Sequence, residues 1–267
     1  MSDITAKSVR IDLLDEQAEL EAMVAGLADE QWQTPTASER WSVADQIGHL
    51  AYFDQTAAWA ITDEIRFKES LAELAPALSG ELSPSEVDDL TLAEYRAVPG
   101  SELLSMWRAR RRELAEASDG LADDSRVIWY GPSMGAKSFL TARLMECWAH
   151  GQHIADALGV ERFPTDRLRH IAQLGFITRN WTYINRGLDT PAVPVRVELT
   201  SPSGSTWTFG PDDAADSVAG DAVDFCLVVT QCRHVNATGL TVTGDAADDW
   251  MTKAQAFAGG ATDGPDA

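Results

Sequence analysis

The stretch Arg143-Leu-Met-Glu146-Cys-Trp-Ala-His150-Gly-Gln-His153 predicts an α-helix that carries a carboxylate and two imidazoles on one face. Successive helical residues are about 100° apart, so Glu146 and His150 differ by only about 40° around the axis, and His153 falls about 20° to the other side of Glu146. An acid and a histidine at i and i+4 bring two metal ligands together without any long-range contact. The sequence therefore predicts that this helix supplies part of a metal site.

A third ligand has to come from another segment, and His49, on a separate predicted helix, is the best candidate. Two imidazoles and one carboxylate match a catalytic zinc set, in which a fourth position is left for water or substrate. Imidazole also binds Ni and Fe, so these two metals stay as alternatives to zinc. The competing interpretation is that Glu146 and His150 form a solvent-facing i, i+4 pair. The apolar residues around them argue against it, because a buried, unpaired carboxylate is costly.

Other polar residues near this pattern allow more than one role. His153 is a candidate catalytic residue that could instead replace His49 as a ligand or only form a hydrogen bond at the edge of the site. Arg233 is a second candidate, since an arginine can bind the carboxylate of a substrate or thiol cofactor, although a surface turn residue is the more common explanation. Asp45 and Asp54 flank His49 by one turn, either as partners that orient its ring or as solvated acids.

Apolar residues at a spacing near 3.6 predict a helical first part of the chain. The predicted helices span residues 7–28, 42–74, 103–117, 138–158 and 165–186. Ser42 begins one of them with a capping-box-like pattern, Ser138 can cap another, and Gly159 stands where that helix should end.

The pattern changes after residue 190. Residues 195–200 and 206–209 alternate apolar and polar side chains across a turn, which predicts a β-hairpin. Residues 221–229 fit a helix or a buried strand, 240–243 a strand and 246–257 a final helix. The predicted fold class is α+β, with a metal-binding helical domain at 1–190, a small α/β domain at 191–260 and a disordered tail at 261–267.

The composition narrows the partners that the protein can have. The 267 residues carry a net charge of −21, which repels phosphate backbones and anionic lipids, so we expect neither nucleic-acid nor membrane binding. Three cysteines without framework spacing indicate reduced thiols and a cytoplasmic protein. The sequence has neither the pattern of a signal peptide nor an apolar run long enough to span a bilayer.

Two motifs resemble the DinB-like, mycothiol-dependent maleylpyruvate isomerase family. Trp41-Ser-Val-Ala-Asp-Gln-Ile-Gly-His49-Leu-Ala resembles its second-helix motif, in which the histidine binds metal. Trp129-Tyr-Gly-Pro-Ser-Met and Ala142-Arg-Leu-Met-Glu146-Cys-Trp-Ala-His150-Gly-Gln resemble the motif that supplies the other two ligands. The resemblance covers residues 8–190 and implies an antiparallel four-helix bundle with the metal near one end.

The resemblance also implies a function. A divalent metal on His49, Glu146 and His150 would bind a low-molecular-weight thiol such as mycothiol for addition to an electrophilic substrate, in a transferase or an isomerase. The alternative is a non-catalytic metal- or ligand-binding helical bundle. The C-terminal segment is similar in position to the α/β domain of the isomerase, and it also resembles a module attached to tRNA wybutosine synthesis enzymes, although the negative charge argues against RNA. The Ala- and Asp-rich composition suits an actinobacterial chain, and a Trp-rich bundle face would allow a homodimer.

Overall fold

The computed structural model describes residues 4–266, and its internal contacts divide the chain into two compact units. The first unit ends at Arg162 and the second begins at Phe163. Residues 163–190, assigned to the helical domain from the sequence, group with the second unit because helix α8 (Leu168–Ile177) packs against helix α10 (Ala222–Val229). The domain assignment itself stays a prediction, and residues 1–3 and 267 of the predicted domain and tail lie outside the described residues.

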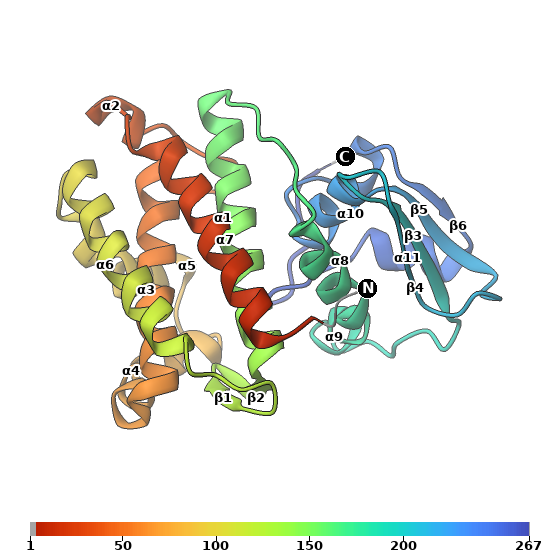
Figure 1. Ribbon diagram of the computed structural model, residues 1–267, viewed down its shortest axis with the longest axis horizontal. Helices are drawn as coiled ribbons and strands as arrows, with labels where there is room; N and C mark the ends of the chain where they lie inside the picture. Colours follow the sequence, from red (N-terminus) through yellow and green to blue (C-terminus); the bar gives the residue numbers. More distant parts are fainter. Residues whose placement is uncertain (1–3, 267) are drawn as a thin grey trace. The chain divides into compact units, whose positions relative to one another are not determined.

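The first unit is a bundle of four long helices with shorter elements at its ends (Figure 1). Its elements are α1 (Ala6–Val24), α2 (Asp29–Trp32), α3 (Val43–Thr62), α4 (Glu64–Leu78), α5 (Pro84–Arg96), α6 (Gly100–Ser118), β1 (Arg126–Trp129), β2 (Gly131–Gly135) and α7 (Ala136–Leu158). Helix α3 packs along α6 and α7, and α1 packs along α7. The predicted antiparallel four-helix bundle, followed by a small α/β part, is therefore confirmed.

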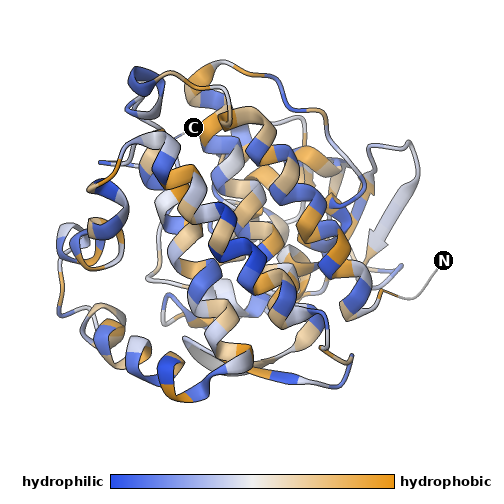
Figure 2. Ribbon diagram, turned by 60° about the vertical axis from the view of Figure 1, so that its left-hand side comes forward, coloured by the Kyte–Doolittle hydropathy of each residue, from blue (hydrophilic) through white to orange (hydrophobic). Residues whose placement is uncertain are grey.

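The bundle helices form because each has one apolar face. In α1 four buried apolar side chains are spaced by four, seven and four residues, which keeps them on one side of the helix. They are Val9, Leu13, Leu20 and Val24. Figure 2 shows orange and blue turns next to each other along the helices. Among the described residues, no helix is both long enough and apolar enough to cross a membrane.

Helix α3 ends earlier than the sequence suggests. The predicted helix over residues 42–74 is in fact two helices, because Asp63 has an extended backbone (φ −145°, ψ 81°) and its carboxylate accepts a hydrogen bond from the Arg66 backbone N–H at 3.1 Å. Asp63 thus caps α4 and breaks the continuous helix. Helix α5 lies against α3, where Gly48 permits close approach: a Cβ there would be 3.0 Å from the Cβ of Tyr95.

A short hairpin leads into α7. The sequence predicts only an irregular connection over residues 119–137, but β1 and β2 pair there as antiparallel strands. Helix α7 then begins after Gly135, three residues before the predicted cap Ser138. It ends as predicted at Gly159, whose φ of 64° lies in the left-handed region that favours glycine.

A buried ion pair joins the four long helices. Asp54 of α3 accepts hydrogen bonds from Arg143 of α7 at 2.8 Å, and from Gln17 of α1 and Trp107 of α6, each at 3.1 Å. The Asp54 and Arg143 side chains are only 2% and 3% exposed. Burial raises the pKa of Asp54, and Arg143 with the two neutral donors opposes that rise. One carboxylate thus contacts all three other helices of the bundle.

The second unit contains a four-stranded sheet covered by helices. Its elements are α8 (Leu168–Ile177), α9 (Arg179–Ile184), β3 (Val195–Thr200), β4 (Thr206–Phe209), β5 (Asp216–Asp221), α10 (Ala222–Val229), the 3₁₀ helix η1 (Val235–Ala237), β6 (Thr241–Thr243) and α11 (Asp245–Met251). The strand order is β4-β3-β5-β6, with β3 and β5 parallel and the other pairs antiparallel. The predicted β3–β4 hairpin is present, and residues 222–229 are helical rather than a strand.

Asp216 fixes the final helix of this unit. Its buried carboxylate accepts hydrogen bonds from the backbone N–H groups of Ala246 and Ala247 at 2.8 and 3.2 Å, at the first turn of α11. Gly244 precedes this turn with a φ of 91°, and an added Cβ would lie 2.2 Å from the Asp216 carboxyl carbon. Only glycine permits both the backbone conformation and the close approach.

We expect Asp54→Asn to lower the free energy of unfolding by about 3–5 kcal/mol, because it leaves Arg143 buried without a charged partner. Urea denaturation followed by helical circular dichroism measures this loss. Glu64→Gln, which removes the exposed Glu64–Lys68 pair within α4, is the control and should cost less than about 0.5 kcal/mol. The double variant Asp54→Asn with Arg143→Met should regain part of the loss. Equal stability of Asp54→Asn and the control would contradict this role.

Candidate metal centre

Two bundle helices supply the candidate ligands. Helix α3 carries His49, and α7 carries Glu146 and His150 one turn apart on the same face. The start of α3 is fixed by a capping box, in which Ser42 and Asp45 exchange hydrogen bonds between side chain and backbone. The packing of α3 on α7 then brings the three side chains together.

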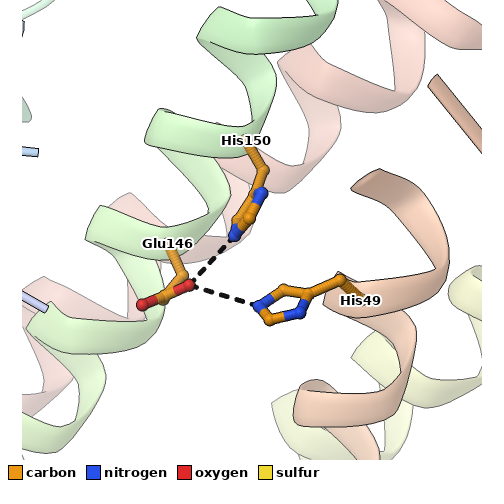
Figure 3. A group of neighbouring side chains, drawn as sticks. All are labelled: His49, Glu146 and His150. Carbon is orange, nitrogen blue, oxygen red and sulfur yellow. Dashed lines mark hydrogen bonds and ion pairs between the residues drawn. The ribbon is translucent and has the colours of Figure 1, made fainter. Parts of the chain in front are cut away.

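Both imidazoles approach the same carboxylate oxygen (Figure 3). Nε2 of His150 lies 3.1 Å from Oε2 of Glu146, and Nε2 of His49 lies 3.5 Å from it. One ligand atom from each of the three side chains lies within 4.8 Å of the others. The side chains are 15%, 19% and 22% exposed for His150, His49 and Glu146, so the group is partly open to solvent.

The spacing of these atoms fits a tetrahedral metal ion. Zinc lies about 2.0–2.1 Å from an imidazole nitrogen, which puts neighbouring tetrahedral ligands about 3.4 Å apart. The two contacts to the carboxylate, 3.1 and 3.5 Å, are close to that value. The donor set of two imidazoles and one carboxylate also suits zinc and other borderline cations.

His49, Glu146 and His150 form a trio whose electrostatics favour the protonation states that bind metal. Burial alone would raise the pKa of Glu146, but the interactions with the two neighbouring imidazoles, of His150 and His49, outweigh it and lower that pKa. Burial, together with repulsion from His49, lowers the pKa of His150 to about 4, against the opposing effect of Glu146. The carboxylate is therefore ionised and the His150 ring neutral near pH 7, as metal coordination requires.

Aromatic rings flank the two histidines. The ring of Trp41 lies 5.0 Å from that of His49 and 5.9 Å from that of His150, nearly parallel to the latter. The ring centre of Phe53 lies 4.6 Å from that of His49. These rings give the site apolar walls and restrict the rotation of the imidazoles.

The tryptophan is itself held by a network of charges. Its indole N–H donates to Oδ1 of Asp88 at 3.0 Å, and Oδ2 of Asp88 accepts from Arg40 at 3.2 and 3.3 Å. Arg96 bridges this network to Asp45, whose Oδ1 accepts from its Nε at 2.6 Å. Asp88 is 8% exposed, so the indole is anchored by a largely buried carboxylate.

A buried glutamine contacts the site from α3, and the sequence analysis missed it. Nδ1 of His150 makes a short hydrogen bond with Oε1 of Gln46, which is fully buried. The amide nitrogen of Gln46 donates to the hydroxyls of Thr36 and Ser38 at 2.8 and 2.9 Å. The available signal was a polar residue within the apolar face of α3, one turn before His49.

The two acids expected to orient His49 or to face solvent are engaged elsewhere. Asp45 pairs with Arg96 and with the cap of α3, and Asp54 pairs with Arg143 in the bundle core. Both are buried, because each has an arginine partner that compensates its charge.

The remaining predicted residues lie around or away from the trio. The ring centre of His153 is 6.4 Å from that of His150, and His153 is not part of the group of close ligand atoms among the described residues. Arg233 belongs to the second unit, where its Nη1 donates to the carbonyl oxygen of Cys232 at 2.7 Å. Cys147 is buried, and burial raises the pKa of its thiol. The catalytic roles of His153 and Arg233 stay predictions.

Residues 13–155 match the family described as the mycothiol maleylpyruvate isomerase N-terminal domain. The chain belongs to this family. The match covers more than half of the chain and includes all three residues of the trio. Two relatives, each called an uncharacterized protein, come from two strains of Mycobacterium tuberculosis; they are 45% identical to this chain over 248 residues, or 93% of this chain and 94% of each relative.

Solved structures extend the likeness to the whole fold. The crystal structure of a mycothiol-dependent maleylpyruvate isomerase matches with a TM-score of 0.57 at 17% identity, covering 91% of this chain and 95% of that one. A histidine-to-alanine mutant of such an isomerase matches with a TM-score of 0.56 at 18% identity, with the same coverage. The predicted DinB-like fold of the isomerase family is thereby confirmed. Residues 191–243 also match a family described as wyosine base formation.

We expect Asp88→Ala to destabilise the isomerase-like bundle by about 1–3 kcal/mol, since the indole N–H of Trp41 and the guanidinium of Arg40 lose a largely buried acceptor. Asp89→Ala is a matched control: Asp89 is the next residue, 80% exposed, and only reaches Arg96 at 3.8 Å. Its removal should change stability by less than about 0.5 kcal/mol. Urea denaturation of both variants measures the difference, and equal midpoints would show that Asp88 is not a structural anchor.

Proposed function

We propose that the protein binds one divalent metal ion through His49, Glu146 and His150 and uses it in thiol-dependent transferase or isomerase chemistry. The observation that carries the proposal is the convergence of three ligand atoms within 4.8 Å, with both Nε2 atoms directed at one carboxylate oxygen. The ionised carboxylate and neutral imidazole support it further. All three residues lie within residues 13–155, the segment that matches the family described as the mycothiol maleylpyruvate isomerase N-terminal domain.

Zinc is the metal we propose first, with nickel or iron as alternatives. Two imidazoles and a carboxylate are ligands that zinc commonly takes in catalytic sites, where three protein ligands leave one position for an exogenous group. Among the described residues, the group of close ligand atoms contains three members and His153 is not one of them. Three ligands, rather than a closed set of four, favour a catalytic over a structural role.

A low-molecular-weight thiol is the proposed cosubstrate, and mycothiol is the first choice because of the family name and the mycobacterial relatives. A divalent cation at this position supplies a Lewis acid that lowers the pKa of a bound thiol and makes it nucleophilic at neutral pH. The rings of Trp41 and Phe53 border the histidines and exclude water from one side of the site.

The proposed substrate is an electrophile with an activated double bond. Addition of the thiol to the double bond, rotation within the adduct and elimination of the thiol give isomerisation, and retention of the thiol gives transfer. His153 is the proposed proton donor or acceptor beside the trio, and the carboxylate-binding role of Arg233 stays a prediction. Among the described residues, Cys147, Cys226 and Cys232 are buried and form no disulfide, which agrees with the proposed cytoplasmic location. A homodimer stays a prediction.

We expect purified protein to contain about one equivalent of zinc or a similar ion per chain, and the variants His49→Ala and Glu146→Gln to contain almost none, because each loses one of three ligands. Elemental analysis by plasma mass spectrometry measures the content. His153→Ala is the control and should keep its metal. Full metal content in Glu146→Gln would place the ion elsewhere.

We expect mycothiol to bind zinc-loaded protein but not chelator-treated protein, because the thiolate needs the cation as its partner. Isothermal titration calorimetry measures this, with the alcohol analogue of the thiol as a matched control that should bind more weakly. Metal binding without any thiol binding would defeat the thiol-dependent part and leave a non-catalytic metal-binding protein.

A further inference from the structure

Gln46 is a fully buried polar side chain whose hydrogen bonds are all accounted for. Its amide nitrogen donates to Oγ1 of Thr36 at 2.8 Å and to Oγ of Ser38 at 2.9 Å. Its carbonyl oxygen faces Nδ1 of His150. The two donors and the acceptor of the amide thus each have a different partner.

The position of the protons fixes which way this amide points. The Thr36 hydroxyl donates its own proton to the backbone carbonyl of Trp41 at 2.9 Å, so towards Gln46 it can only accept. A reversed amide would set the oxygen of Gln46 against that acceptor, leaving a buried repulsive contact. The amide nitrogen therefore faces the two hydroxyls, and Oε1 faces His150. Because Oε1 is only an acceptor, Nδ1 of His150 has to carry the proton of that hydrogen bond.

We propose that Gln46 is a positioning residue that keeps a proton on Nδ1 of His150, so that Nε2 offers its lone pair to a metal ion. This rests on the proposed function of the trio as a metal site. A metal-bound imidazole uses one nitrogen as ligand, and the hydrogen bond of the other nitrogen sets which one it is.

The same hydrogen bond prevents a competing arrangement. Nε2 of His150 lies 3.1 Å from Oε2 of Glu146, within hydrogen-bond range. With the proton on Nε2, His150 would donate a hydrogen bond directly to the Glu146 carboxylate. The two side chains would then be paired with each other instead of with a metal ion. With the proton held on Nδ1, the lone pairs of Nε2 and of Oε2 face one another at 3.1 Å. A cation between them relieves that repulsion, so the Gln46 contact favours metal binding over a closed His–Glu pair.

The test combines zinc affinity with direct observation of the proton. Gln46→Leu removes the acceptor of the Nδ1 proton. Gln55→Leu is the matched control, since Gln55 lies on the same helix but faces Arg110. Competition with a chromophoric chelator gives the affinity of each protein for zinc, and ¹⁵N-edited NMR of metal-free wild-type protein shows which nitrogen of His150 is protonated. Circular dichroism verifies that each variant is folded.

We expect Gln46→Leu to bind zinc about 10–100-fold more weakly than the wild type, as other losses of a ligand's hydrogen-bond partner do. Gln55→Leu should keep the wild-type affinity, and NMR should find a proton on Nδ1. Wild-type affinity in folded Gln46→Leu, or an unprotonated Nδ1 in the wild type, would overturn the inference. If wild-type protein binds no zinc, the proposed function fails instead, and the NMR result alone decides the role of Gln46.

Discussion

The bundle depends on one buried contact, the ion pair between Asp54 and Arg143. The carboxylate of Asp54 also accepts from Gln17 and Trp107, so a single side chain is bonded to α1, α6 and α7 from within α3. An ion pair of this kind need not add net stability, but a partner moved out of register would be left charged and unpaired. It therefore specifies how α3 lies along α7. His49 is five residues before Asp54, and Glu146 is three residues after Arg143. The alignment of α3 with α7 that forms the ion pair therefore also brings the trio together.

The sequence predicts features that are set by residues close together in the chain, but not features that depend on contacts with residues of other helices. Glu146 and His150 could be paired because their spacing alone puts them on one face, and His49 was a candidate from its place on a separate predicted helix, supported by the resemblance of its motif to a family pattern. The helix end at Asp63 was missed, since nothing in the apolar periodicity opposes a continuous helix there. Gln46 was missed because its role comes from hydroxyls in the preceding loop and a ring on α7. The motif resemblance predicted the DinB-like fold, whereas residues 163–190 could not be assigned to a unit without tertiary contacts.

The loop before α3 is built more rigidly than its polar sequence suggests. Arg40 has a φ of 66°, a conformation that costs a residue with a side chain about 1–2 kcal/mol. Its guanidinium reaches Asp88, which also holds the indole of the next residue, Trp41. Thr36 donates to the Trp41 carbonyl and accepts from Gln46. The hydrogen bonds of Arg40 and Thr36 thus hold this strained turn close to residues that border the histidines. Strained backbone conformations are often found at functional sites.

The three candidate ligands are divided between α7 and a helix far earlier in the chain, so the binding of a metal ion by all three would be linked to folding. An unfolded chain, or α7 alone, offers at most Glu146 and His150, and the third ligand arrives only when α3 docks against it. An ion that binds this trio binds the native state and not the unfolded one, so its occupancy adds directly to thermodynamic stability. At a free concentration one hundred times its dissociation constant, that gain is about 2.7 kcal/mol. In a cell starved of the ion, the same protein would turn over faster because more of it would be unfolded at any moment.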